Sequence, residues 1–146
     1  MATPTLEGTT ALISDRYIVS FTAGEDLTAG LVVYLSAAWT VKKTDGARKD
    51  VVGVTLTAAK SGSKVAVVCR GLVRVIASAA ISVAARIVSA TNGKVAAVTA
   101  LSAPSSYSQA SMQTELDKIE DWFGMALTAA SADGDVINAL ICGHVP

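Results

Sequence analysis

The sequence predicts an all-β protein, a small β-barrel built from two similar halves with one short helical insertion. One observation behind this prediction is the alternation of short β-prone runs with glycine-containing turns, which is typical of small barrels and sandwiches. The other is a repeat: residues 52–59 (VGVTLTAA) reappear as residues 123–130 (FGMALTAA), 71 residues later. A repeat of apolar spacing and glycines specifies backbone geometry and packing rather than a reaction.

The repeat extends to both sides of these segments. Further along the chain, Gly62 and Val65 recur as Gly134 and Ile137, with an offset of 72 residues. The beginning of each half matches more weakly, with Leu27, Val33 and Val41 opposite Ile81, Ile87 and Val95. The two halves are therefore expected to form similar strand units, with their glycines in equivalent positions. Five glycines are predicted to be structural turn residues: Gly30, Gly53, Gly62, Gly124 and Gly134.

Strand signals follow one another along the chain. The alternation in residues 17–22 predicts a first strand, and residues 31–35 and 39–42 are two further β-prone runs. Residues 64–76 predict the longest strand, because one of its faces is free of charge and the other carries all of its bases. That basic face is expected to meet solvent or a partner. Turns are predicted at Asp45-Gly46, residues 61–63, Asn92-Gly93 and residues 133–135.

A helix is predicted inside residues 104–122, where the second half is longer than the first. Ser106 and Gln109 have the spacing of a capping box after Pro104. Apolar residues then follow at helical steps: Met112, Leu116, Ile119 and Phe123. This stripe is expected to pack across one end of the barrel rather than to dock a partner, while the charged residues of the helix face solvent.

The composition favours a protein that is partly covered by partners. The chain has 146 residues, enough for one domain with a real core, and 51% of them are apolar although only 5% are aromatic. Only 16% are charged, against about 25% in typical soluble domains. Little charge is then left to cover a free surface. The alternative is a compact monomer with a surface rich in serine and threonine.

The zero net charge hides an uneven distribution. Residues 1–41 carry a net charge of −3, residues 42–94 a net charge of +8, and residues 95–146 a net charge of −5. The basic segment contains no Phe, Tyr or Trp on which bases could stack, and the chain has no recognition-helix or zinc-finger pattern. Nucleic acid is therefore not expected as a direct partner. Contact between opposite-sign faces of neighbouring subunits explains the asymmetry at least as well.

Motifs for catalysis and metal binding are nearly absent from the sequence. His144 is the only histidine, which argues against a histidine-centred triad and excludes a multi-histidine metal site. Residues 133–135 (DGD) resemble the start of a calcium loop but lack its further ligands. The sequence therefore predicts neither an enzyme nor a cofactor or metal site.

The cysteines and the apolar stretches favour a chain without a disulfide or a membrane span. Cys69 and Cys142 lie at nearly the same place in each half, and two buried free thiols are favoured over a disulfide between the halves. The longest uncharged apolar stretch in the middle of the chain, residues 75–85, falls short of the roughly 20 residues of a membrane span. The first residues lack the basic and apolar regions of a signal peptide.

Several of these segments together resemble a known family. Residues 23–34 (AGEDLTAGLVVY) are similar to the opening of the capsid cement, or head decoration, proteins of tailed viruses. The resemblance continues in residues 52–54 (VGV), residues 61–71, residues 124–127 (GMAL) and the acidic glycine turn at residues 133–135. It covers roughly residues 17–145, with Ala84-Ala85 where such chains usually carry Ala-Gly.

The resemblance implies a β-barrel of the β-tulip kind, often trimeric, clamped over junctions between major capsid protein subunits on the outer surface of a virion. The expected function is therefore a virion structural protein that decorates and stabilises the capsid. Two alternatives remain open: another virion β-module, such as a tail or head–tail component, and a β-barrel that binds glycans or a host surface.

The expected organisation is a single barrel domain, residues 17–146, preceded by an extended N-terminal arm, residues 1–16. Pro4 and Gly8 break regular structure in the arm, which has no counterpart in the second half. Strand addition on a neighbouring subunit would satisfy its backbone hydrogen bonds, and the alternative is an arm that folds back on its own barrel. Five residues are candidate capsid or subunit contacts: Leu6, Leu12, Ile13, Arg70 and Arg74.

Overall fold

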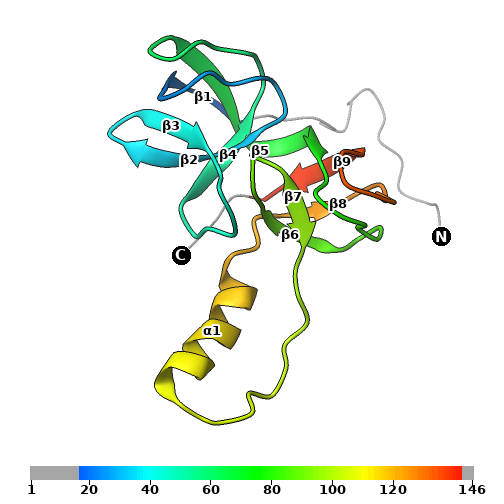
Figure 1. The fold of residues 1–146 in the computed structure, drawn as a ribbon. Coiled ribbons are helices and arrows are strands. Elements are labelled where there is room, and N and C mark those ends of the chain that lie inside the picture. The colour runs from blue at the N-terminus through cyan, green and yellow to red at the C-terminus, as the bar shows by residue number, and fades with distance from the viewer. Residues whose placement is uncertain (1–16, 143–146) are drawn as a thin grey trace, which may run out of the picture.

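The computed structural model describes residues 17–142, which form nine strands in one sheet and one helix (Figure 1). The elements are β1 (Tyr17–Ala23), β2 (Val32–Ala37), β3 (Thr40–Lys43), β4 (Val51–Thr55), β5 (Lys64–Ile76), β6 (Arg86–Ser89), β7 (Val95–Ala97), α1 (Gln109–Glu120), β8 (Gly124–Ala126) and β9 (Val136–Ile141). The predicted arm with Leu6, Leu12 and Ile13 lies outside the described residues, and so does His144.

The sheet closes on itself in its first half. Its strand order is β1-β3-β2-β4-β5-β9-β8-β6-β7, and an additional antiparallel pairing of β1 with β5 joins the first strand to the fifth. The five strands β1 to β5 therefore form a closed barrel. The prediction of an all-β barrel with one helix is confirmed. The four strands that were predicted with residue ranges, β1, β2, β3 and β5, begin and end within two residues of those ranges.

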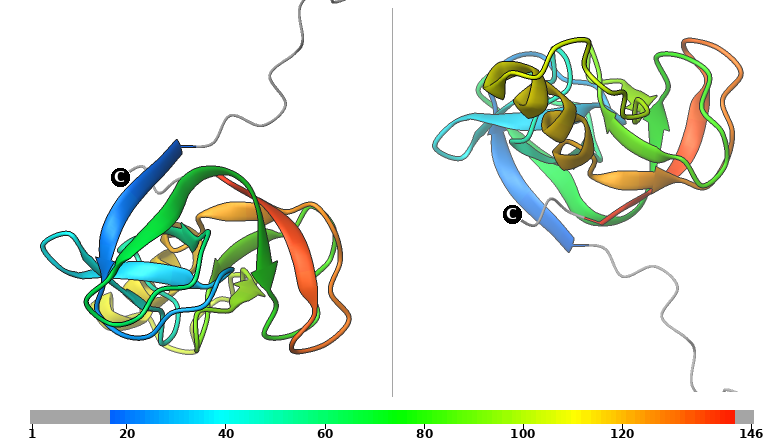
Figure 2. Two further views of the ribbon diagram at one scale, coloured as in Figure 1. Left: turned by 90° about the horizontal axis from the view of Figure 1, so that it is seen from above. Right: turned by 90° about the horizontal axis from the view of Figure 1, so that it is seen from below.

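The long strand β5 belongs to both halves of the molecule. Its first part, residues 64–70, pairs with β1 and β4, while its second part, residues 71–76, pairs with β9. We call β1–β4 with residues 64–70 the first barrel, and residues 71–76 with β6–β9 the second barrel. The two lie side by side along β5 (Figure 2). The second barrel is completed by a parallel bridge between Ala77 and Val95.

Equivalent backbone contacts show that the second barrel repeats the first. The backbones of Leu27 and Ala59 exchange two hydrogen bonds of 2.8 and 2.9 Å. Their repeat counterparts, Ile81 and Ala130, do the same at 3.0 and 2.9 Å. The parallel bridge at Ala77 likewise matches the parallel pairing of Ala23 with Val41 in the first barrel. The predicted similarity of the halves is therefore present in the chain path.

The core consists of two clusters of small apolar side chains, one in each barrel. The first barrel encloses Phe21, Ala23, Leu27, Val33, Val41, Val65 and Val67. The repeat counterparts in the second barrel are Val75, Ala77, Ile81, Ile87, Val95, Ile137 and Ala139. The second cluster also contains Phe123, a large side chain with only 1% of its surface exposed. Few large side chains fill either barrel, as the aromatic content predicts.

Two of the predicted turn glycines lie within strands. Gly53 is in the middle of β4 and Gly124 begins β8, so their assignment to turns is wrong. Each is instead a place where two backbones approach closely. A Cβ atom on Gly53 would lie 2.1 Å from the carbonyl oxygen of Val68, and one on Gly124 would lie 2.5 Å from that of Leu140. Because no side chain fits at either place, both positions require glycine.

The other three glycines are in turns that need a left-handed backbone. Gly30, Gly62 and Gly134 have φ angles of 82°, 85° and 92°. The second-half counterpart of Gly30 is Ala84, which holds a φ of 66°. The two residues make the same hydrogen bond. The Gly30 N–H donates to the carbonyl of Thr55, and the Ala84 N–H donates to the carbonyl of Ala126, each at 2.8 Å. Alanine is strained in this region, whereas glycine is not.

Replacing Ala84 with glycine is expected to stabilise the protein by about 1 kcal/mol, because the left-handed penalty exceeds the entropy cost of glycine. Urea unfolding of both proteins measures the difference. Val83→Gly is the matched control, since Val83 has no positive φ and glycine there only loosens the unfolded chain. Equal destabilisation by Ala84→Gly and Val83→Gly would show that Ala84 is not strained.

The helix differs from its prediction at both its start and its exposed face. Ser108 is the N-cap, and it forms the capping box with Ser111 rather than Ser106 with Gln109. The hydroxyl of Ser111 accepts a hydrogen bond from the Ser108 N–H at 2.9 Å. In most capping boxes a Glu or Gln side chain accepts this bond. The predicted packing of the apolar stripe is wrong for Met112 and Leu116, which are 44% and 45% exposed, whereas Phe123 at its end is buried in the second barrel. Figure 1 shows α1 extending away from both barrels.

Candidate functional site

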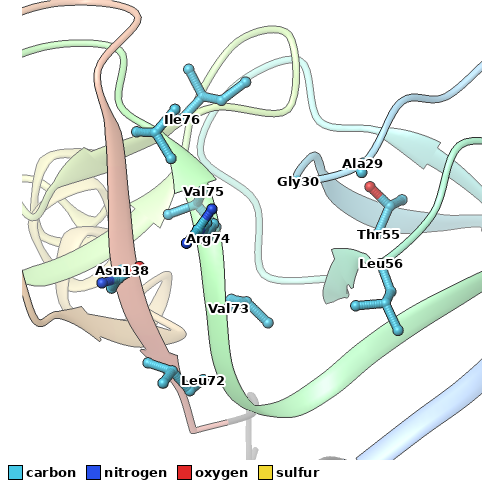
Figure 3. Close-up of a pocket in the computed structure, with 11 residues that line it drawn as sticks. Ala29, Gly30, Thr55, Leu56, Leu72, Val73, Arg74, Val75, Ile76 and Asn138 are labelled. Atoms are coloured by element: carbon cyan, nitrogen blue, oxygen red, sulfur yellow. The ribbon is translucent and has the colours of Figure 1, made fainter.

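An apolar groove opens between the two barrels, where β5 crosses from one to the other (Figure 3). Its volume is about 670 Å³. The first barrel contributes residues 29–30 and 55–56, and the second contributes residues of β5 and β9. Six Val, Leu and Ile side chains line it: Leu56, Leu72, Val73, Val75, Ile76 and Val136. Three of these, Leu56, Leu72 and Val136, are 38%, 37% and 63% exposed, so the groove offers apolar surface to a partner.

Arg74 is the single charged side chain that lines this groove. It lies on β5 directly opposite Asn138 of β9. Within residues 17–142 it forms no ion pair, so its charge is available to an acidic group. Of the two predicted arginine contacts, the structure therefore brings Arg74 into a shaped site. Arg70 lies on the first barrel, paired with Tyr17 of β1, and does not line the groove.

The charged face of α1 stays partly in solvent, with Asp117 and Glu120 side chains 40% and 51% exposed, but both acids also pair with the first barrel. Lys49, in the loop between β3 and β4, donates to Asp117 at 2.6 Å and to Glu120 at 2.9 Å. Lys49 lowers the pKa of the Asp117 carboxyl below its ordinary value, and both acids raise the pKa of Lys49. In the middle of the helix, Glu115 accepts from Lys118 at 2.7 Å and from the Ser102 N–H at 3.0 Å. These contacts join the helix to its surroundings while Met112 and Leu116 stay exposed.

Replacing Lys49 with methionine is expected to release α1, seen as faster amide hydrogen exchange in the helix and unchanged exchange in the barrels. Because the folded pKa of Asp117 is lowered, the contact with Lys49 is complete above the ordinary pKa of aspartate. It is lost as the pH falls through the lowered value. Lys60→Met, which removes the exposed pair with Asp26, is the control. Equal exchange in wild type and Lys49→Met would exclude this tether.

The segregated charge is partly neutralised within the chain. Lys49 and Lys94 of the basic segment pair with acids of the third segment, the latter with Asp133 at 2.7 Å. Lys60 pairs with Asp26 of the first segment at 3.4 Å. Contact between neighbouring subunits is therefore not required for these bases. The arginines of β5 are different, because neither Arg70 nor Arg74 has an ion-pair partner among residues 17–142.

The described residues contain no group of three His, Cys, Asp or Glu side chains that could hold a metal ion. Cys69 and Cys142 are both free thiols, and each is partly buried rather than fully buried. Burial raises the pKa of the Cys69 thiol, which disfavours the reactive thiolate. Between residues 17 and 142, no helix combines the length and apolar composition that crossing a bilayer requires.

The structure thus defines a duplicated β-barrel protein with an apolar groove between its barrels. A solved structure with the same fold is the N base of the head fiber gp8.5 of bacteriophage phi29. The two match with a TM-score of 0.60 and 14% identity, over 90% of this chain and 99% of that one. The model of the phage cement protein family matches residues 13–141, so the chain belongs to that family. No curated protein sequence matches it.

Membership in this family makes the chain a capsid-associated structural protein of a bacteriophage virion. Of the groove residues, the sequence singled out only Gly30 and Arg74, and the others, among them Leu56, Leu72 and Asn138, were missed. Leu72 carried a usable signal, because it stands between Arg70 and Arg74 on the basic face of β5. Leu56 lies in the repeated segment, where its counterpart Leu127 is equally exposed, so the repeat itself gave no reason to single it out.

Proposed function

We propose that this protein binds the outer surface of a phage capsid across neighbouring major capsid protein subunits and thereby stabilises the shell. The observation that carries the proposal is the exposed apolar groove with the guanidinium of Arg74, which has no ion-pair partner among residues 17–142. Each square ångström of apolar surface covered contributes about 25 cal/mol. Because such a contact recurs at every equivalent position, a modest energy per copy reinforces the whole shell. The proposed role is structural, with neither catalysis nor a cofactor.

The family and the low surface charge also support three finer parts of this proposal. The protein assembles as a trimer, and its barrels have the arrangement called a β-tulip. Residues 1–16 act as an arm that reaches a neighbouring subunit through Leu6, Leu12 and Ile13. The partners of the protein are the major capsid protein and further copies of itself, without direct contact to nucleic acid or membrane. Arg70 remains a second candidate contact next to the groove.

Capsid binding is tested with particles that lack this protein, by titrating the purified chain and measuring occupancy. Leu72→Asp and Arg74→Glu are each expected to weaken binding by about tenfold or more, or ~1.4 kcal/mol, because one places a charge in the apolar wall and the other reverses the free cation. Salt should weaken wild-type binding if Arg74 meets an acidic group, since the Debye length is about 8 Å at physiological ionic strength.

The matched control is Ile18→Asp. Ile18 is the counterpart of Leu72 in the first barrel, with 45% of its surface exposed, but it does not line the groove. It should bind particles as wild type does. Full occupancy by Leu72→Asp and Arg74→Glu would contradict the groove as a capsid contact, and absence of wild-type binding to the shell would contradict the proposed function.

A further inference from the structure

The internal repeat makes it possible to compare what covers the same surface on each barrel. On the first barrel, Val32, Val54 and Val68 form a row across β2, β4 and β5, with Val32 paired to Val54 and Val54 to Val68. We call this the junction row. Its side chains point out of the first barrel, since their neighbours Val33 and Val67 fill its core. All three are 0% exposed and belong to the core cluster of the second barrel.

The counterpart of this row on the second barrel is uncovered. Arg86 pairs with Met125, and Met125 pairs with Leu140, in the same cross-strand register on β6, β8 and β9. We call these three residues the outer row. Leu140 is 38% exposed, Arg86 is exposed and Met125 is half-buried. The guanidinium of Arg86 lies over the ring of Trp122, 5.0 Å from its centre. Arginine, methionine and tryptophan are enriched in protein interfaces.

The surface that covers the junction row includes the turn between β6 and β7. The N–H of Val32, in the junction row, donates to the carbonyl of Gly93 at 2.8 Å. The N–H of Gly93 donates to Thr44 at 3.0 Å, and the Thr44 hydroxyl donates to the carbonyl of Ala90 at 2.8 Å. Ser89 is buried in the same contact and donates to the carbonyl of Gly46 at 2.8 Å. This turn of the second barrel is thus the partner of the first barrel.

The counterpart of that turn on the first barrel is the turn between β2 and β3, and it is also uncovered. In the repeat, Leu35 corresponds to Ser89 and Trp39 corresponds to Gly93. Trp39 and Gly93 both have a positive φ, of 54° and 71°. Leu35 is 45% exposed and Trp39 is 65% exposed, although Ser89 and Gly93 are buried. An exposed tryptophan therefore stands where the second barrel has its internal contact.

We propose that the turn between β2 and β3 of one copy docks on the outer row of a second copy, repeating the contact that joins the two barrels within each chain. Both halves of that contact exist a second time in the sequence, and neither copy is covered within residues 17–142. Trp39 belongs to the turn, and Trp122 lies beside the outer row under Arg86. The two surfaces differ, so the contact is head-to-tail and forms a closed ring when the rotation closes. The inference rests on the proposed self-association and names the surfaces that produce it.

Light scattering after size-exclusion chromatography of the isolated protein tests this contact without any capsid. Wild type should be an oligomer, and Trp39→Gly and Leu140→Asp should each raise its dissociation constant by about 30-fold or more, the loss typical of an interface hot spot. Trp39→Gly keeps a backbone that suits positive φ, and thermal unfolding checks that both variants fold. Tyr17→Ser is the control, because Tyr17 is as exposed as Trp39 but lies on neither surface.

Mixing the two variants sharpens the test. Each retains one intact surface, so a mixture should form a dimer through the intact turn of Leu140→Asp and the intact outer row of Trp39→Gly. A monomeric wild type would overturn the proposal. So would wild-type oligomerisation of either Trp39→Gly or Leu140→Asp alone, or a mixture of the two variants that stays monomeric. These outcomes are independent of capsid binding, which the groove variants measure separately.

Discussion

Replacing Gly53 with alanine is expected to lower the free energy of unfolding by about 4 kcal/mol or more, a large part of the 5–15 kcal/mol typical of a domain. The new Cβ would lie 2.1 Å from the carbonyl oxygen of Val68 and 2.9 Å from its carbon. Both atoms are backbone, so relief requires moving β4 away from β5. That movement would break the closed barrel where β2, β4 and β5 meet.

Urea unfolding measures this loss, and the repeat supplies a graded comparison. Gly124→Ala should be less severe, because its Cβ would lie 2.5 Å from the Leu140 oxygen and then 3.3 Å from a movable methyl group of Ile141. Gly46→Ala is the control, since nothing lies within 4 Å of its Cβ position. It should change stability by no more than about 0.5 kcal/mol. A Gly53→Ala protein as stable as Gly46→Ala would refute the close approach.

The second large effect is expected at Phe123, the largest fully buried side chain among the described residues. Phe123→Ala should cost about 3–5 kcal/mol, because it removes an aromatic ring from a core otherwise built of Val, Ile and Ala and leaves a cavity. Its N–H donates to Ile87 at 3.0 Å and its carbonyl accepts from Cys142 at 3.0 Å, so the backbone holds the cavity open.

Thermal unfolding compares Phe123→Ala with Val52→Ala, its repeat counterpart in the first barrel. Val52 is only half-buried at the margin of the smaller cluster, and Val→Ala removes two methyl groups rather than a ring, so the substitution should cost much less. Comparable losses at the two positions would mean that the barrels are filled alike. That result would contradict the assignment of Phe123 as the central side chain of the second barrel.

The repeat and the strands could be predicted because both are encoded by local spacing. Alternation along residues 64–76 gives the two faces of β5, and the repeated segments give equivalent strands. The sequence did not reveal that β5 serves both barrels, because sharing one strand depends on pairing with segments far along the chain. The requirement for glycine at Gly53 and Gly124 could not be predicted for the same reason. It arises from a neighbouring strand that lies far away in the sequence, and without that strand both residues resemble turn glycines.

The groove and the helix were harder to predict for different reasons. Leu56 and Leu72 meet at the groove only because β5 crosses between the barrels, so no local pattern marks them as neighbours. The apolar stripe of α1 predicts packing, but Met112 and Leu116 are exposed, while Asp117 and Glu120 pair with Lys49 in the loop between β3 and β4. No local pattern marks this contact, because Lys49 lies far from the helix along the chain.

The most direct test of the account is a cryo-EM comparison of phage particles with and without this protein. The account predicts extra density on the outer face of the head, spanning adjacent major capsid protein subunits, with the groove around Arg74 in contact with the shell. Density confined to the tail or the head–tail junction, or a head surface identical in both maps, would contradict it.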